Sequence, residues 1–206
     1  MSDGDALRAL LAAEVALVAA SPDGAIEVVE PGVAAAGVVL SGSFDPLHDG
    51  HVQLAAVVAS LVGADASYEL SVTNVDKPPL EEPEVRRRLA QFEGLPAATG
   101  RLLLTRAPTF VEKARLLPGR AFAIGWDTAV RLVHARYYDG SERAMLDALA
   151  EMLDLGCRVY VAGRDHDGAF RTLADVDVPP AVAKLFVAVP EDRFRLDISS
   201  TALRDG

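Results

Sequence analysis

Short apolar runs alternate with amphipathic segments along most of this chain. The apolar runs have the length and composition of strands that are buried on both faces of a parallel sheet. They are Val38–Ser41, Tyr68–Val72, Leu102–Thr105, Ala121–Ile124, Arg158–Val161 and Leu185–Val189. Helices are predicted between them at Val52–Leu61, Pro83–Phe92, Thr109–Leu117 and Ser141–Leu155. This alternation predicts an α/β fold built on a doubly wound parallel sheet.

The first 36 residues precede this pattern and are predicted to extend it. Residues 5–20 have the spacing of an extra amphipathic helix, and Ile26–Val29 is a candidate edge strand. We therefore expect an N-terminal segment, 1–36, packed on a main domain, 37–206. The total length of 206 residues suits one large domain with a sizeable core.

Charge and composition argue against several classes of protein. The formal net charge of −10 disfavours nucleic acid as a partner. No apolar run is long enough to cross a membrane, and the acidic start lacks the basic region of a signal peptide. Cys157 is the only cysteine, which fits a reducing cytoplasm. Oligomeric state, including a homo-oligomer, is left open by the sequence.

The turn between the first predicted strand of the main domain and its helix is rich in candidate chemistry. The segment Ser41–His51 reads SGSFDPLHDGH and holds two of the four histidines, His48 and His51. Strand-to-helix turns of parallel α/β folds bind phosphates, because helix N–H groups and the helix dipole favour anions. Paired histidine donors at such a turn suit a triphosphate. The alternative is a tight turn with a solvated histidine pair.

A second candidate segment lies near the C-terminus. Ile198–Arg204 reads ISSTALR, in which the hydroxyl cluster predicts a helix N-cap and the arginine follows about one turn later. Amides, hydroxyls and one guanidinium would together form a phosphate clamp. Taken alone, this pattern is also typical of an ordinary capped helix.

Together, the two segments resemble the HxGH and ISSTxxR signatures of the nucleotidylyltransferase superfamily, and the resemblance covers roughly residues 37–206. It implies a Rossmann-like fold and transfer of a nucleoside monophosphate, without a covalent enzyme intermediate, as pyrophosphate leaves. It assigns catalysis to His48, His51 and Arg204. It assigns nucleotide binding to Gly42, Ser43, Phe44, Gly50, Asp127, Ser199, Ser200 and Thr201. Mg²⁺ is expected to offset the remaining phosphate charge.

Two further turns at predicted strand ends offer substrate contacts. Thr73–Pro79 contains Asn74 and Lys77, which suit a substrate group and a phosphate, although a solvated loop explains them equally well. Gly125-Trp126-Asp127 resembles the Gly-x-Asp segment of the superfamily, whose aspartate contacts ribose. Asp127 as a simple helix N-cap is the alternative. Trp126 either stacks on a base or fills core.

Only the resemblance to known families narrows the choice of acceptor substrate. Phe44-Asp45-Pro46 with His48 looks most like nicotinamide-mononucleotide adenylyltransferases, which implies AMP transfer from ATP to a nicotinamide or nicotinate mononucleotide in NAD metabolism. A cytidylyltransferase acting on a phosphorylated alcohol stays open, because the stretches 69–80 and 137–141 look like a distinct, cytidylyltransferase-like branch. A nucleotide hydrolase or a nucleotide-binding sensor on the same fold also stays open.

Two other polar features favour structural roles. Arg86, Arg87 and Arg88 have acidic neighbours on a predicted helix, which favours a solvated face. His134 and His166 have no metal-ligand spacing around them, so no zinc site is predicted.

Overall fold

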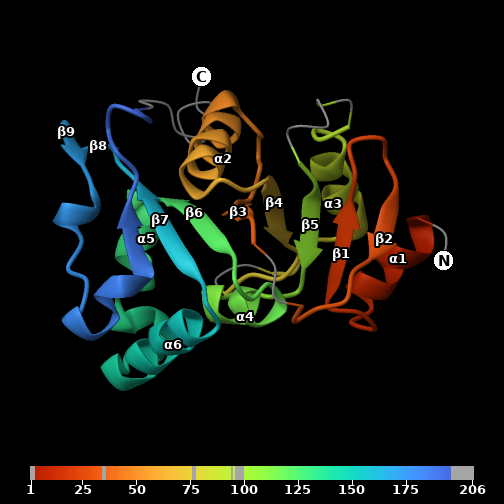
Figure 1. The fold of residues 1–206 in the computed structure, drawn as a ribbon. Helices are drawn as coiled ribbons and strands as arrows, with labels where there is room; N and C mark the ends of the chain where they lie inside the picture. The colour runs from red at the N-terminus through yellow and green to blue at the C-terminus, as the bar shows by residue number, and fades with distance from the viewer. Residues whose placement is uncertain (1–2, 34–35, 76–77, 94, 96–99, 196–206) are drawn as a thin grey trace.

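The protein is described here by a computed structural model that covers residues 3–33, 36–75, 78–93, 95 and 100–195. Within these residues, one eight-stranded sheet has the order β10-β7-β6-β3-β4-β5-β1-β2 (Figure 1). Its strands are β1 Leu17–Ala20, β2 Ile26–Val28, β3 Val38–Ser41, β4 Ala66–Ser71, β5 Leu102–Thr105, β6 Ala121–Gly125, β7 Arg158–Ala162 and β10 Phe186–Ala188. A separate hairpin joins β8 (Arg164–His166) to β9 (Ala169–Arg171).

Six α-helices accompany the sheet in the described part of the chain. They are α1 Asp3–Leu11, α2 Asp49–Val62, α3 Glu82–Leu89, α4 Phe110–Leu116, α5 Trp126–Leu132 and α6 Glu142–Asp154. Short 3-10 segments are η2 Ala135–Tyr138, η3 Leu173–Asp175 and η4 Pro180–Leu185. None of the helices in the described ranges is long and apolar enough to cross a membrane.

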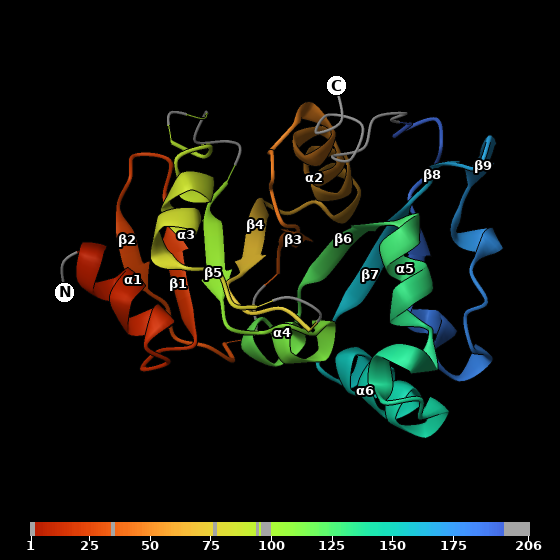
Figure 2. The same ribbon diagram turned by 180° about the vertical axis from the view of Figure 1, so that it is seen from behind.

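The two faces of the sheet bury two separate apolar clusters. Neighbouring strand residues alternate between them: Val38 and Leu40 of β3 belong to one cluster, and Val39 belongs to the other. Helices α1, α2 and α3 supply the first cluster, whereas α4, α5 and α6 supply the second. The views from front and back show α2 and α6 on opposite sides of the sheet (Figures 1 and 2). This period of two explains why the strands read as continuous apolar runs.

The parallel part of the sheet is doubly wound, as the sequence predicts. From β3 the chain moves through β4 to β5, then returns to the other side of β3 with β6 and continues to β7 and β10. The direction of strand order therefore reverses between β3 and β6. In open α/β sheets, ligands bind at the carboxyl ends of the strands beside such a switch point.

The N-terminal segment differs from the predicted helix over residues 5–20. Helix α1 ends at Leu11, the chain turns at Ala13 with a φ of 62°, and residues 17–20 form β1. The turn uses a left-handed alanine rather than glycine or proline, so no sequence signal marked it. Strand β1 pairs antiparallel with β5, and β2 completes this edge of the sheet, as expected for an edge strand.

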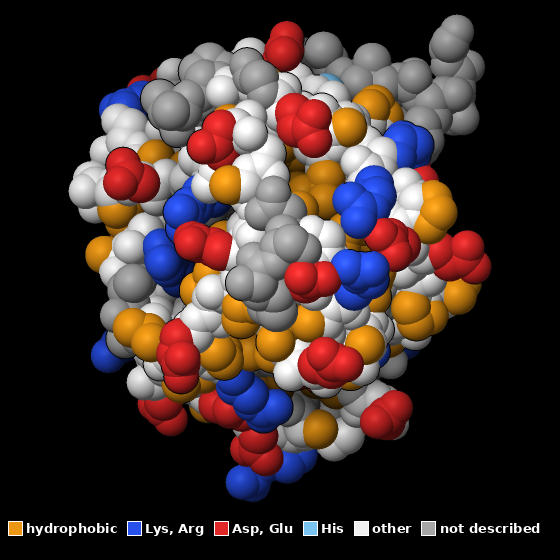
Figure 3. Space-filling model, turned by 90° about the vertical axis from the view of Figure 1, so that its right-hand side faces the viewer, with side chains coloured by type: hydrophobic (Ala, Val, Ile, Leu, Met, Phe, Trp, Pro, Cys, Tyr) orange, Lys and Arg blue, Asp and Glu red, His pale blue; other side chains and the backbone are white. Residues whose placement is uncertain are grey.

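The outer face at this edge mixes both signs of charge. Figure 3 shows arginine and lysine side chains interspersed with aspartate and glutamate there, rather than gathered into one patch. Arg101 and Glu27 form one such pair, with 2.8 Å between Nη1 and Oε1. On this face, therefore, neither sign of charge forms a continuous patch.

Candidate active site

A cavity of about 280 Å³ lies at the switch point between β3 and β6. We call it the switch-point cavity. Its walls come from the ends of β3, β6 and β7 and from the first turns of α2 and α5. The lining residues are Leu40, Ser41, Gly42, Ser43, His48, Gly50, His51, Leu54, Ala123, Ile124, Gly125, Asp127, Thr128, Ala162, Gly163, Arg164 and Phe194. Six of the predicted site residues therefore line one cavity: Gly42, Ser43, His48, Gly50, His51 and Asp127.

The two histidines meet at the N-terminus of α2. His48 is the N-cap residue, and the rings of His48 and His51 are stacked with centroids 3.7 Å apart. The backbone N–H of His48 donates to Nδ1 of His51 over 3.3 Å. Because a neutral imidazole carries one proton, this bond places the His51 proton on Nε2. His51 is thereby prepared to donate a hydrogen bond from Nε2.

Both imidazoles are held in the neutral form at neutral pH. Burial, with a smaller contribution from the nearby His48, lowers the pKa of His51 to about 4. Burial also lowers the pKa of His48, although Asp49 opposes this shift. An anion that enters the cavity would favour the protonated forms of both rings. Without a bound anion, the pair is therefore uncharged at neutral pH.

The Phe44 ring packs against His51, and this packing explains why residue 42 is a glycine. The Phe44 ring is fully buried and meets His51 edge to face, with centroids 5.2 Å apart. A Cβ atom at position 42 would lie 2.9 Å from the Phe44 Cε1 atom. Glycine at 42 therefore lets the ring pack against the end of β3. Phe44 itself lines neither of the cavities described here, so its contact is with the histidine.

Ser41, the last residue of β3, has a buried hydroxyl beside the switch-point cavity. Among the residues that the structure describes, its Oγ has no hydrogen-bond partner. A buried hydroxyl without a partner costs stability, so such groups in native proteins call for an explanation. A phosphate or ribose oxygen of a bound nucleotide would supply the missing partner after a change of χ1 rotamer.

Asp127 lies between two arginines. Arg164 donates from Nη1 to Oδ1 over 3.1 Å, and Arg131 approaches Oδ2 at 3.5 Å. The N-cap of α5 is Gly125, so Asp127 is not the simple N-cap that the sequence allowed. Sequence reasoning missed Arg164 and Arg131. Arg164 follows the carboxyl end of β7, and the strand-end rule that selected the other turns applies to it equally.

Trp126 lies apart from this cavity wall. It packs against the apolar cluster of α5 and α6, and its ring is 4.9 Å from that of His166. It lines a different cavity beside Val130 and Met145. Trp126 is partly buried in these contacts, and stacking on a base stays a prediction.

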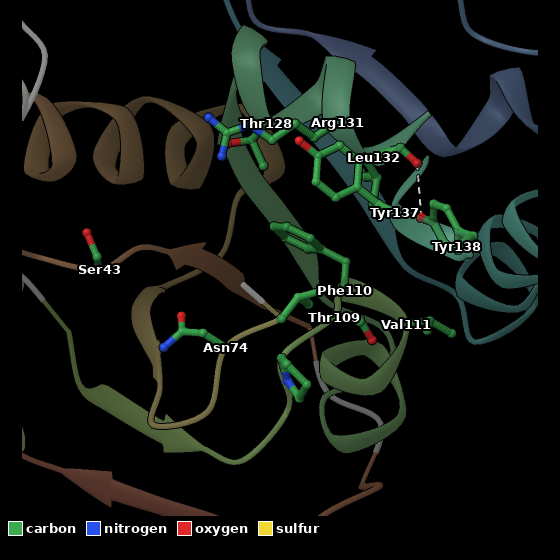
Figure 4. Close-up of a pocket in the computed structure, with 12 residues that line it drawn as sticks. Ser43, Asn74, Thr109, Phe110, Val111, Thr128, Arg131, Leu132, Tyr137 and Tyr138 are labelled. Atoms are coloured by element: carbon green, nitrogen blue, oxygen red, sulfur yellow. Dashed lines mark hydrogen bonds between the residues drawn. The ribbon is translucent and has the colours of Figure 1, made fainter. Parts of the chain in front are cut away.

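A second and larger cavity, of about 460 Å³, adjoins the first, and Figure 4 shows the residues that line it. We call it the side cavity. Its lining residues are Ser43, Asn74, Val75, Pro108, Thr109, Phe110, Val111, Thr128, Arg131, Leu132, Tyr137 and Tyr138. Ser43 and Thr128 line both cavities. Arg131 is the charged member of this set, and Phe110 and Tyr137 present aromatic rings to the space (Figure 4).

Asn74 is thus placed in the side cavity, away from the histidines. Five other predicted residues, Lys77, Ser199, Ser200, Thr201 and Arg204, lie outside the described residues. Phe194 lines the switch-point cavity, so this cavity lies beside the end of the described chain at residue 195.

The arginine run on α3 is only in part the predicted solvated face. Arg86 pairs with Glu82 on the surface, as expected. Arg88 is 11% exposed and donates to the backbone carbonyl of Ser43, so its charge is directed at the histidine-bearing turn. The sequence could not show this contact because 45 positions separate the two residues.

The described side chains do not form a protein cage for a metal. No group of three or more histidine, cysteine, aspartate or glutamate side chains is placed to hold an ion in the described ranges. Asp127, the carboxylate of the switch-point cavity, is already paired with two arginines. The Mg²⁺ expected from the resemblance therefore stays a prediction. Cys157 is buried, which raises its thiol pKa and fits a packing role.

Comparison with known families agrees with this geometry. The chain belongs to the cytidylyltransferase-like family, whose model matches residues 39–206. All residues that line the two cavities lie within this range. Membership supports a nucleotidyltransferase activity in general, with a nucleoside triphosphate as one substrate. No curated protein matches the chain.

Proposed function

We propose that this protein transfers a nucleoside monophosphate, AMP from ATP, to a phosphorylated small molecule that carries an aromatic ring. A nicotinamide or nicotinate mononucleotide is such an acceptor. An oxygen of the acceptor phosphate attacks the α-phosphorus of the triphosphate and forms a new P–O bond. The bond from the α-phosphorus to the bridging oxygen breaks, and pyrophosphate leaves with its electron pair.

The observation that carries this proposal is the pair of adjoining cavities. A direct transfer needs both substrates bound at once, with the reacting phosphates in contact. The switch-point cavity holds the histidines and the α2 N-terminus, and the side cavity holds Arg131 and two aromatic rings. Ser43 and Thr128 line both, so the two phosphates would meet above these residues.

The residues of the switch-point cavity would stabilise the charge that develops during transfer. His48 and His51 donate hydrogen bonds to phosphate oxygens, and the 14-residue helix α2 directs its positive dipole end at them. Arg164 adds a fixed positive charge. Ser199, Ser200, Thr201 and Arg204 hold the β and γ phosphates, with Mg²⁺ carried on the triphosphate. The enzyme contributes position and electrostatics, and no group of the protein is covalently modified.

The side cavity supports the choice of acceptor. Phe110 and Tyr137 offer apolar faces on which a planar ring can stack, and Arg131 offers a bidentate partner for a phosphate. Asn74 and Thr109 add polar groups for the remaining edges. A small phosphorylated alcohol, the acceptor of a cytidylyltransferase, would leave this aromatic wall uncovered.

Release of pyrophosphate from ATP and from CTP tests the proposal, with and without a panel of phosphorylated acceptors. We expect release from ATP that depends on a ring-bearing acceptor phosphate. Preference for CTP with a phosphorylated alcohol would favour a cytidylyltransferase. Release without any acceptor would indicate a hydrolase, and nucleotide binding without turnover would indicate a sensor.

A further inference from the structure

Two side chains, one in helix α3 and one just after it, form hydrogen bonds with the turn that carries the two histidines. Arg88 donates from Nη1 to the carbonyl of Ser43 over 2.8 Å. Gln91, just beyond the helix, uses both ends of its amide: Nε2 donates to the carbonyl of Phe44, and Oε1 accepts from the N–H of Leu47, each over 2.8 Å. This part of the turn lies outside the helices and strands, so side chains rather than a regular element supply hydrogen bonds to its backbone groups.

The gripped residues include a strained one. Phe44 has a φ of 47°, in the left-handed region that bulky side chains rarely adopt. The carbonyls held by Arg88 and Gln91 are those of Ser43 and Phe44, so these bonds set the orientation of the peptide planes before and after the Phe44 Cα atom. The Phe44 ring in turn supports His51. A continuous set of contacts therefore runs from α3 through Phe44 to the imidazole.

We propose that Arg88 and Gln91 are positioning residues for nucleotidyl transfer, acting through the histidine-bearing turn. This inference rests on the proposed function. Neither side chain lines either cavity, so neither touches a substrate directly. Their role is to hold the donor atoms of His51 in place, because a displacement of about 1 Å at a reacting centre costs on the order of 10²-fold in rate.

Gln91→Met tests the amide contacts. Methionine has a similar length and no charge, but it cannot replace either hydrogen bond. We expect kcat to fall about 10-fold or more, with KM for both substrates little changed, because substrate contacts are intact. Gln53→Met is the matched control on the exposed face of α2, and it should keep wild-type kcat.

Arg88→Gln and Arg86→Gln form a second matched pair. Each removes one positive charge from α3, but the Arg86 side chain is half exposed and its guanidinium pairs with Glu82 on the surface of the helix. Arg88→Gln should lower kcat, whereas Arg86→Gln should not. Arg88→Lys should recover part of the loss, since one ammonium proton can still reach the Ser43 carbonyl.

A histidine titration by NMR reads the geometry without any turnover. In Gln91→Met, a loosened turn should move the pKa of His51 upward from about 4 toward its ordinary value, as its burial decreases. His134 and His166 are internal controls, because both lie away from the turn. In the folded variant, a lower kcat with an unchanged His51 titration, or the reverse, overturns the inference. If the wild-type protein transfers to no acceptor, the proposed function fails, and the titration alone still decides whether α3 holds the turn.

Discussion

The two cavities of this protein are built in different ways, although they share a wall. The switch-point cavity takes its chemistry from backbone and compact groups at strand ends, with neutral histidines at a helix N-terminus. The side cavity is made of larger side chains from separate segments, among them Phe110, Arg131 and Tyr137. In the proposed function, the first arrangement binds phosphate, which all nucleotides share. In the proposed function, the second arrangement binds the acceptor.

This division gives a direct reason why family membership defines the donor better than the acceptor. A phosphate site depends on a turn and a helix end, which the fold itself supplies. An acceptor site depends on which side chains the loops present. Substitutions on the two sides should therefore have separable effects.

The largest effect is expected at the centre of the switch-point cavity. His51→Ala removes a preorganised donor and should lower turnover about 10²-fold or more. The protein should remain folded, which circular dichroism can check. His134→Ala is the control, because His134 lines neither of these cavities and caps η2 instead. Turnover close to wild type in folded His51→Ala would remove this residue from the mechanism.

The two arginines test whether the cavities act separately. Arg131→Met should raise KM for the acceptor about 10-fold, the value of one charge-assisted contact, with a smaller effect on nucleotide affinity. Arg164→Met should show the reverse pattern, measured by calorimetry with a triphosphate and by acceptor kinetics. Equal changes in both quantities for both variants would mean that the shared Asp127 joins the cavities into one electrostatic unit.

Acid should weaken folding through the switch-point cavity. The folded state lowers the pKa of His51 to about 4 from 6.5, so between these values the unfolded chain binds more protons than the folded protein. The free energy of unfolding therefore falls as pH drops from about 6.5 to 4, by up to about tenfold in the folding constant per pH unit. His51→Gln should remove this contribution. Urea unfolding of both proteins across this range measures it, and parallel pH profiles would contradict it.

The smallest effect is expected at Ser41. Ser41→Ala removes a buried hydroxyl that has no partner, so the free energy of unfolding should stay level or rise, while triphosphate affinity falls a few-fold. Ser71 ends the neighbouring strand β4, and its hydroxyl donates to the Thr73 carbonyl over 2.6 Å. Ser71→Ala should therefore show the opposite pattern: lower stability and unchanged affinity. A loss of stability in Ser41→Ala without a loss of affinity would make Ser41 purely structural.

The difference between the two cavities also explains how much of the candidate site could be predicted from the sequence. The turn from Gly42 to His51 is continuous in sequence, so its chemistry and its strand-to-helix setting could be predicted together. The side cavity joins Asn74, Phe110 and Tyr137, which the chain brings together only by winding back across the sheet. The contact from Gln91 to Phe44 spans 47 positions and leaves no periodic pattern. Aromatic and amide side chains of this kind are read as ordinary core or surface until the fold places them.

Strands β1 and β2 have a consequence for how the protein can be shortened. The family match begins at residue 39, and a fragment cut there would lose β1, whose four residues are all buried beside β5. Strand β5, Leu-Leu-Leu-Thr, would then become an exposed hydrophobic edge strand. Its unpaired backbone groups could form hydrogen bonds with strands of other chains. We expect such a fragment to scatter light and precipitate while the full chain stays dispersed. Strands β1 and β2 would therefore protect the full chain from self-association through β5.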